Sequence, residues 1–231
     1  MTRAEQIAEN LDRVREEIAA AAARAGRRPE DVTLVAVSKT KPAADIAAAC
    51  EAGQRDFGEN YAQELDRKCD ELGAGPRFHM IGHLQRNKVK LVVGRVVLVQ
   101  TVDSLRLAQA LARRAAAAGL TVPVLLEVNV GGEWSKSGLA PDGASELLAQ
   151  LGEIPQLEPR GLMCIPPFVA ANQARPYFRQ LRELRETLVA GLPAGHRFDQ
   201  LSMGMSHDFA AAVEEGATIV RVGTAIFGER G

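Results

Sequence analysis

The sequence has few aromatic residues and few cysteines. Aromatic side chains make up 4% of its 231 residues and hydrophobic residues 46%, so a core has to be built from aliphatic side chains. The cysteines, Cys50, Cys69 and Cys164, are odd in number, widely spaced and without a C-x-x-C pair. This pattern argues against a disulfide framework or a zinc knuckle, and it favours the reducing cytoplasm as the location.

The sequence also lacks an excess of charge of one sign. Lys and Arg number 28 against 29 Asp and Glu, which gives a formal net charge of -1. Such a chain has no overall field that would concentrate a polyanion, so nucleic acid is not an expected partner. An anionic small molecule would need a local binding site.

Long hydrophobic runs are absent. A charge, Gly or Pro interrupts each apolar stretch well before the roughly 20 residues that a bilayer-spanning helix needs. Residues 1–26 combine charged and apolar residues at helical spacing without the apolar stretch of a secretory signal, and they predict an amphipathic helix. We expect a soluble, cytoplasmic and monomeric protein with no membrane partner.

After this first helix, short β-branched or apolar runs alternate with longer amphipathic segments. The runs predict strands buried on both faces. They are Val32 to Ser38, Arg55 to Gly58, Arg77 to Ile81, Val96 to Gln100, Val122 to Val130, Leu157 to Met163, Phe198 to Met203 and Thr218 to Gly223.

Several amphipathic segments between these runs stop at a glycine, the usual left-handed terminator of a helix. They are Ala43 to Glu51 with Gly53, Tyr61 to Leu72 with Gly73, Ser104 to Ala118 with Gly119, and Ala171 to Ala190 with Gly191. About eight strand-helix units predict a parallel sheet closed into one (βα)8 barrel of the TIM type, with an extra N-terminal helix. The alternative is an open doubly wound sheet. No repeat or linker marks a boundary, so residues 1–231 are expected to form a single domain.

Polar and turn-forming residues gather where the predicted strands end. In chain order they are Lys39, Glu59 and Asn60, Gly82 and His83, Thr101 and Asp103, Asn129, Met163 and Cys164, Met205 and Ser206, and Thr224. In a barrel the carboxyl ends of all strands converge on one face, where barrel proteins place their chemistry.

Lys39 ends the first predicted strand, in VTLVAVSKT, and it is one of only six lysines. Desolvation at the mouth of a barrel favours the neutral amine, which is the form that condenses with an aldehyde. The alternative is a lysine that extends its ammonium to solvent from a strand end.

The segments LSMGMSHDFAAAVEEG and IVRVGTAIFGER follow the last two predicted strands, where barrels frequently bind phosphate. Ser206 is predicted to cap a helix that begins near His207, Gly223 would let the backbone approach an anion, and Thr224 adds a hydroxyl donor. The alternative is an ordinary N-cap and turn.

Arg221 lies inside the last predicted strand, where a charge needs a partner. A guanidinium directed at a pyridine nitrogen would donate a hydrogen bond, keep that nitrogen unprotonated and weaken the ring as an electron sink. The alternative is a salt bridge across the barrel to Glu127 or Glu59.

No metal site is predicted. His79 and His83 are four residues apart on or beside a strand, which separates them by about 13 Å and prevents chelation of one ion. His196 and His207 are no better placed as ligands. Lys136, in WSKSG, is expected in a solvated loop.

Eight sequence blocks taken together resemble the pyridoxal 5′-phosphate (PLP) homeostasis proteins, a family related to the N-terminal barrel of alanine racemase. The blocks are LVAVSKTKP, FGENYAQE, FHMIGHLQRNK, TVDS, SKSG, RGLM, LSMGMSHDF and VRVGTAIFGER. The resemblance implies PLP bound as an aldimine to Lys39 and Arg221 facing the pyridine nitrogen. It also implies a pocket lined by Asn60 and His83, and a phosphate group held by Met205, Ser206, Gly223 and Thr224.

The resemblance further implies a protein that buffers or delivers PLP, has no catalytic residues and can have PLP-requiring apo-enzymes as partners. An alternative is a PLP-dependent amino-acid racemase. A racemase resembling this barrel needs a C-terminal β-domain with a catalytic tyrosine, whereas the sequence stops at Gly231, so binding is favoured over turnover. A Schiff-base aldolase acting on a sugar phosphate ranks last, because it gives Arg221 no role.

Overall fold

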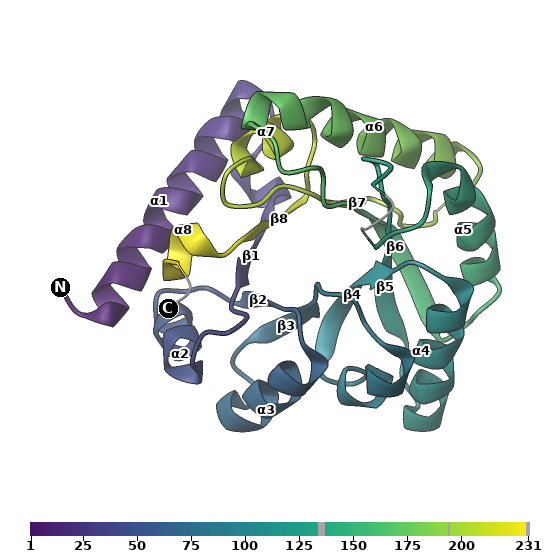
Figure 1. Cartoon of the computed structure of the whole chain (residues 1–231), viewed down its shortest axis with the longest axis horizontal. Helices are drawn as coiled ribbons and strands as arrows, with labels where there is room; N and C mark the ends of the chain where they lie inside the picture. Colours follow the sequence, from purple (N-terminus) through teal and green to yellow (C-terminus); the bar gives the residue numbers. More distant parts are fainter. Residues whose placement is uncertain (134–136, 194, 230–231) are drawn as a thin grey trace.

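The computed structural model of the protein describes residues 1–133, 137–193 and 195–229 (Figure 1). Its strands are all parallel and form a closed barrel in the order β1 to β8. Their bounds are β1 Thr33–Val37, β2 Asp56–Glu59, β3 Arg77–Met80, β4 Val96–Val102, β5 Val122–Glu127, β6 Leu157–Met163, β7 Gln200–Ser202 and β8 Ile219–Val222. The predicted barrel is confirmed, and the open doubly wound sheet was wrong because β8 pairs with β1.

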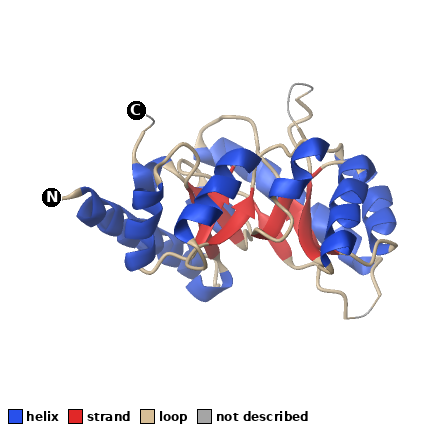
Figure 2. Ribbon diagram, turned by 90° about the horizontal axis from the view of Figure 1, so that it is seen from below, coloured by secondary structure: helices blue, strands red, loops and turns tan. Residues whose placement is uncertain are grey.

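Helices surround the strands (Figures 1 and 2). The α-helices are α1 Arg3–Arg24, α2 Ala43–Glu51, α3 Ala62–Leu72, α4 Leu105–Ala118, α5 Ala144–Gly152, α6 Ala171–Ala190, α7 Phe209–Glu214 and α8 Thr224–Phe227. Short 3-10 helices are η1 Pro29–Asp31, η2 Arg86–Leu91 and η3 Pro141–Gly143. No described helix is both long and apolar enough to cross a lipid bilayer.

The predicted helix ends are largely confirmed. Tyr61 and Ser104 are N-caps, one residue before α3 and α4 begin. Gly119 has the expected left-handed conformation (φ 66°, ψ 30°), but Gly191 has φ -92°, so the prediction of a left-handed terminator there was wrong. The last turn of α6 tightens instead, because the N–H of Gly191 bonds to the carbonyl of Leu188, three residues back.

Helix α1 confirms the predicted N-terminal helix. It begins with a capping box in which the side chains of Thr2 and Glu5 bond to each other's backbone N–H. Its buried face includes Ile7, Leu11 and Ile18, and the helix packs against α2, α7 and α8. Helix α1 therefore lies on the outside of the barrel near β8, the strand that closes it.

The hydrophobic residues form two separate clusters. The larger cluster includes the apolar faces of the helices, and the smaller consists of Val35, Leu98, Leu125, Met163 and Ile219, one residue from each of five strands. The strands also carry buried polar residues, among them Asp56, His79, Gln100, Ser202 and Arg221. These polar groups need partners, because burying an unpaired polar group is costly.

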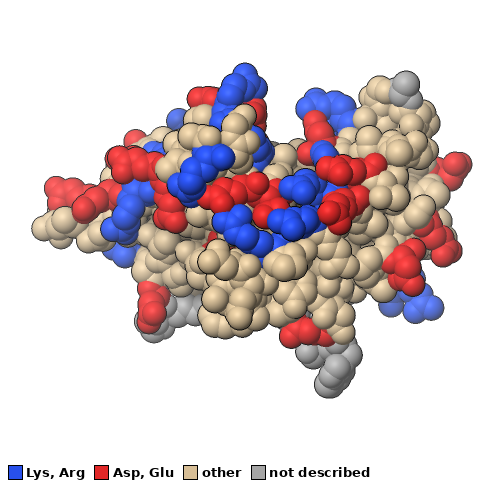
Figure 3. All heavy atoms as spheres, turned by 90° about the horizontal axis from the view of Figure 1, so that it is seen from above, with Lys and Arg blue, Asp and Glu red and all other residues tan. Residues whose placement is uncertain are grey.

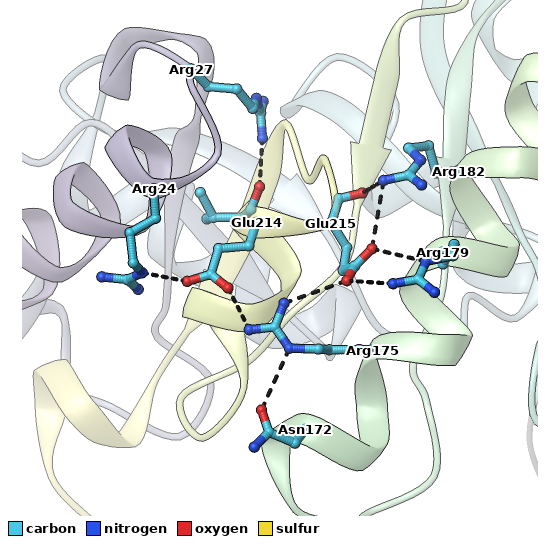
Figure 4. A network of polar contacts seen from close by, with 9 residues as sticks. Arg24, Arg27, Asn172, Arg175, Arg179, Arg182, Glu214 and Glu215 are labelled. Atoms are coloured by element: carbon cyan, nitrogen blue, oxygen red, sulfur yellow. Dashed lines mark hydrogen bonds and ion pairs between the residues drawn. The ribbon is translucent and has the colours of Figure 1, made fainter.

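An ion-pair network fixes α7 between α1 and α6 (Figure 4). Glu214 binds Arg24 of α1, with Nε and Oε1 2.6 Å apart, and it also pairs with Arg175 of α6. Glu215 Oε1 lies 3.1 Å from Nη2 of Arg179. Basic and acidic side chains are interspersed across the face seen in Figure 3. The network restrains α7, and with it the 203–208 loop that precedes the helix.

Candidate functional site

Lys39 lies in a tightly held turn at the carboxyl end of β1. The turn is closed by the N–H of Lys41, which donates to the carbonyl of Ser38 at 3.0 Å. Thr40 has φ 63°, the one positive value among the described non-glycine residues, and its N–H donates to Glu64 Oε1 at 2.7 Å. A left-handed non-glycine residue costs about 1 to 2 kcal/mol and persists only where its surroundings enforce it. The backbone that carries the half-buried Lys39 is therefore fixed from outside the turn.

The surroundings that enforce this turn centre on Lys68, a lysine of α3 that is only 1% exposed. Its Nζ donates to Glu59 Oε1, Glu64 Oε1 and the carbonyl of Ser38, each at 2.7 Å. The hydroxyl of Ser38 donates to the same oxygen of Glu59 at 2.6 Å. Burial raises the pKa of Glu59, although the hydrogen bonds from Lys68 and Ser38 oppose that rise.

Sequence reasoning missed Lys68. Two signals were present: the i, i+4 spacing of Glu64 and Lys68, and the position of Glu59 at the end of a strand. Neither signal showed which face of α3 would meet the end of β1.

Arg221 lies in β8 and is 4% exposed. Its Nη1 donates to Ser202 Oγ at 2.6 Å, and its Nη2 donates to the carbonyl of Cys164 at 2.8 Å. Within the described part of the chain it forms no ion pair with Glu59 or Glu127, so the predicted salt-bridge alternative is not formed. Burial lowers the pKa of Arg221, while the charges of Cys164, Glu127 and Asp208 act in the opposite direction. Since the described residues use two of its five N–H donors, the other three can bind a ligand.

Ser206 does not cap α7, so that prediction was wrong. Helix α7 begins at Phe209, and Asp208 closes the preceding turn by accepting the N–H of Met205 at 2.6 Å. Ser206 Oγ instead accepts the N–H of Gly223 at 3.1 Å and that of Ala225 at 3.5 Å. The loop that contains Met205 and Ser206 is thus joined directly to the start of α8 at Thr224.

The pairing of the strands brings most predicted site residues to one part of the barrel mouth. Arg221 of β8 pairs with Val35 of β1, and a Cβ at Gly223 would lie 3.3 Å from the carbonyl oxygen of Val37. Asn60 follows β2, the other neighbour of β1, and its buried Oδ1 has no hydrogen-bond partner among the described residues. The order β7, β8, β1 and β2 therefore makes neighbours of the segments that carry Ser206, Gly223, Lys39 and Asn60.

His83 is less closely associated with this group. It follows β3, its side chain is 56% exposed, and its Nδ1 lies 3.8 Å from Asp103 Oδ2. Its predicted contact with a ligand remains a prediction. Lys136 of the SKSG segment lies outside the described residues. Within the described part of the chain, no three His, Cys, Asp or Glu side chains are grouped so that they could hold a metal ion.

Glu127 is a titratable group that the sequence suggested only as a salt-bridge partner. It is the last residue of β5, and its buried Oε2 lacks a hydrogen-bond partner among the described residues. Burial and the charge of Asp103 raise its pKa to about 7, although Arg221 opposes the rise. The strand was predicted to continue to Val130, but it ends at Glu127 because the carbonyl there accepts the N–H of Leu139 from the returning loop.

The arrangement offers three complementary chemistries on adjacent strands: an amine, a buried guanidinium donor, and a loop-helix junction organised by a hydroxyl. Asn60 Oδ1 and Glu127 Oε2, which have no hydrogen-bond partner in the described part of the chain, add buried polar atoms that a ligand could satisfy. A ligand with an aldehyde, an aromatic nitrogen and a phosphate group fits this donor set.

The chain is similar to known proteins over nearly its whole length. Residues 9–231 match the family model described as alanine racemase, N-terminal domain. The pyridoxal phosphate homeostasis protein of Escherichia coli K12 is 48% identical over 231 residues, covering 97% of each chain. The structure of PipY of Synechococcus elongatus with PLP bound is 38% identical, with a TM-score of 0.83, and covers 96% of this chain and 100% of PipY.

An alanine racemase from Clostridium difficile is only 14% identical, with a TM-score of 0.76, and it shares the fold over 98% of this chain and 56% of its own. The far closer relatives are named homeostasis proteins rather than enzymes. The chain therefore belongs to the alanine racemase N-terminal domain family and, within it, to the family of the pyridoxal phosphate homeostasis proteins.

Proposed function

We propose that this protein binds PLP through a Schiff base on Lys39 and buffers or delivers the cofactor. The observation that carries the proposal is the pairing of β1 with β8, which sets the fixed Lys39 turn beside the strand that holds Arg221. PipY, the relative whose structure has PLP bound, has the same fold. When bound, PLP supplies an aldehyde that a lysine amine can hold reversibly.

Each predicted site residue has a separate role in this proposal. Arg221 donates a hydrogen bond to the pyridine nitrogen from inside the barrel. The Met205-Ser206 loop and the Gly223-Thr224 segment bind the phosphate group, held together by the hydroxyl of Ser206. Asn60 lines the pocket beside Lys39, and His83 lines it farther away, after β3.

The role of Arg221 suits holding PLP or racemising an amino acid better than chemistry that requires a strongly stabilised carbanion. A guanidinium keeps the pyridine nitrogen unprotonated, and an unprotonated ring stabilises a carbanion poorly. We infer that the protein has no catalytic residues and passes PLP to apo-enzymes that require it. The alternative, an amino-acid racemase, shares the barrel but has to work without a strong electron sink.

Borohydride trapping tests the proposal. The protein incubated with PLP should develop a visible absorbance that borohydride abolishes while fixing the label to Lys39. Peptide mapping locates the label, and Lys41→Ala is the matched control, since Lys41 lies two residues away in the same turn. A label on Lys41 or Lys136, or no label, would refute the assignment.

Turnover assays separate the binding protein from the enzyme. The loaded protein should reactivate a PLP-requiring apo-enzyme and should not racemise, transaminate or decarboxylate common amino acids. Turnover at about 1 per second or faster would restore the racemase alternative.

A further inference from the structure

A chain of hydrogen bonds links five strands and ends at Arg221. His79 Nε2 lies 3.0 Å from Asp56 Oδ1, and His79 Nδ1 lies 3.1 Å from Gln100 Nε2. Ser202 Oγ donates to Gln100 Oε1 at 2.6 Å and accepts from Arg221 Nη1 at 2.6 Å. All five residues are at least nine-tenths buried.

The orientation of the Gln100 amide gives every hydrogen bond in this chain one direction. Arginine can only donate to Ser202, and the hydroxyl of Ser202 donates in turn to Gln100 Oε1. That contact directs the amide nitrogen of Gln100 at His79 Nδ1, which therefore has to be an unprotonated acceptor. The proton of the neutral His79 ring lies on Nε2 and is donated to Asp56.

Asp56 completes the far end of the chain. Burial acts to raise its pKa, but the hydrogen bonds from His79 and Arg77 prevail and hold the pKa below its ordinary value. The carboxylate is thus a permanent acceptor for His79, just as Arg221 is a permanent donor to Ser202. A chain with a fixed acceptor at one end and a fixed donor at the other has one preferred orientation.

We propose that His79, Gln100 and Ser202 are positioning residues that hold Arg221 in place for the pyridine nitrogen of PLP. This inference rests on the proposed function. The second anchor of Arg221, the carbonyl of Cys164, is backbone, so the chain supplies the side-chain contact that sets the guanidinium. Removing one hydrogen bond of this chain should therefore alter the absorbance of bound PLP. If the chain had a purely structural role, the absorbance would stay the same.

The first test needs neither PLP nor a variant. ¹⁵N NMR of the histidine-labelled apo-protein at neutral pH should show His79 as the neutral tautomer protonated at Nε2. A ring protonated at Nδ1 would refute the derived direction of the chain.

The second test compares Ser202→Ala with Thr101→Val. Thr101 is also buried and donates its hydroxyl to the carbonyl of Gly82, but it lies outside the chain. Ser202→Ala should weaken PLP binding about tenfold, the loss expected for one hydrogen bond to a charged group, and shift the absorbance of bound PLP. Thr101→Val should change neither quantity, and Gln100→Leu should reproduce the effect of Ser202→Ala.

The outcomes separate the two proposals. If the wild-type protein does not take up PLP, the proposed function fails, whereas the NMR result still reports on the hydrogen-bond chain. If the wild-type protein binds PLP and both chain variants keep its affinity and spectrum, the positioning role is refuted. A fall in melting temperature without a spectral change would likewise assign the chain a structural role only.

Discussion

Glu59 Oε1 and Lys68 Nζ lie 2.7 Å apart, with side chains that are 0% and 2% exposed. Such a pair gains little over an apolar pair of similar size, but losing one partner leaves a buried charge. Here the pair also bonds the backbone carbonyl of Ser38, immediately before Lys39. The pair therefore links the stability of the barrel to the position of the proposed PLP lysine.

Lys68→Met should destabilise the protein by about 3 to 5 kcal/mol, because Glu59 would lose its buried counter-charge. Urea unfolding measures the loss. The double variant Lys68→Met/Glu59→Gln removes both charges of the pair and should regain much of the lost free energy of unfolding. A single variant as stable as the wild type would show that the pair contributes nothing to stability.

Arg221→Gln should weaken PLP binding by about tenfold or more and shift the absorbance of bound PLP, because the pyridine ring loses a charged hydrogen-bond donor. The barrel should remain folded by circular dichroism, since Ser202 and the Cys164 carbonyl are neutral partners. Unchanged affinity and spectrum, or an unfolded chain, would argue that Arg221 is purely structural.

Glu127→Gln should stabilise the protein increasingly as the pH rises. The pKa of Glu127 is raised to about 7 from an ordinary value near 4.5, so its favourable contribution is complete below about pH 4.5 and is lost as the pH rises through 7. At pH 8 the variant should be more stable than the wild type by up to about 3 kcal/mol, and the two should converge near pH 4. Thermal unfolding of both proteins across this range provides the measurement. A difference that does not depend on pH would mean that Glu127 titrates normally.

Ser206→Ala should weaken the binding of PLP about fivefold, because the loop would lose the hydroxyl that bonds the N–H of Gly223. Pyridoxal, which has the ring and the aldehyde but no phosphate group, is the control ligand and should be affected little. Fluorescence titration gives both affinities. If the affinities for PLP and for pyridoxal fall equally, Ser206 has no specific role in binding the phosphate group.

Hydrophobic patterning predicted the strands, because a parallel barrel buries short apolar runs on both faces. It failed at the end of β5, where Val128 and Val130 continue the apolar pattern although the backbone turns to meet Leu139. It predicted that Arg221 would be buried, but it could not identify Ser202 as its partner. That contact depends on how β7 and β8 are placed in the barrel, which no local pattern contains.

The same limit applies to the polar interior. His79, Gln100 and Ser202 come from three separate strands, and only the closed barrel brings them into one hydrogen-bonded chain. Lys68 was missed for a related reason, because its burial depends on how α3 docks against β1 and β2. Sequence motifs thus predicted the ligand-facing residues, whereas the residues that support them became apparent only from the fold.

The packing of α1 has a consequence for the order in which the chain can fold. Asn10 of α1 bonds to the carbonyl of Ile226, 216 positions later, and α1 also packs against α7. During synthesis the apolar surface that α1 presents to α7 and α8 stays uncovered until nearly all of the chain has been made. Chains stalled before α7 would lack the closing strand β8 and two of the three α-helices that α1 packs against, which makes them prone to aggregation.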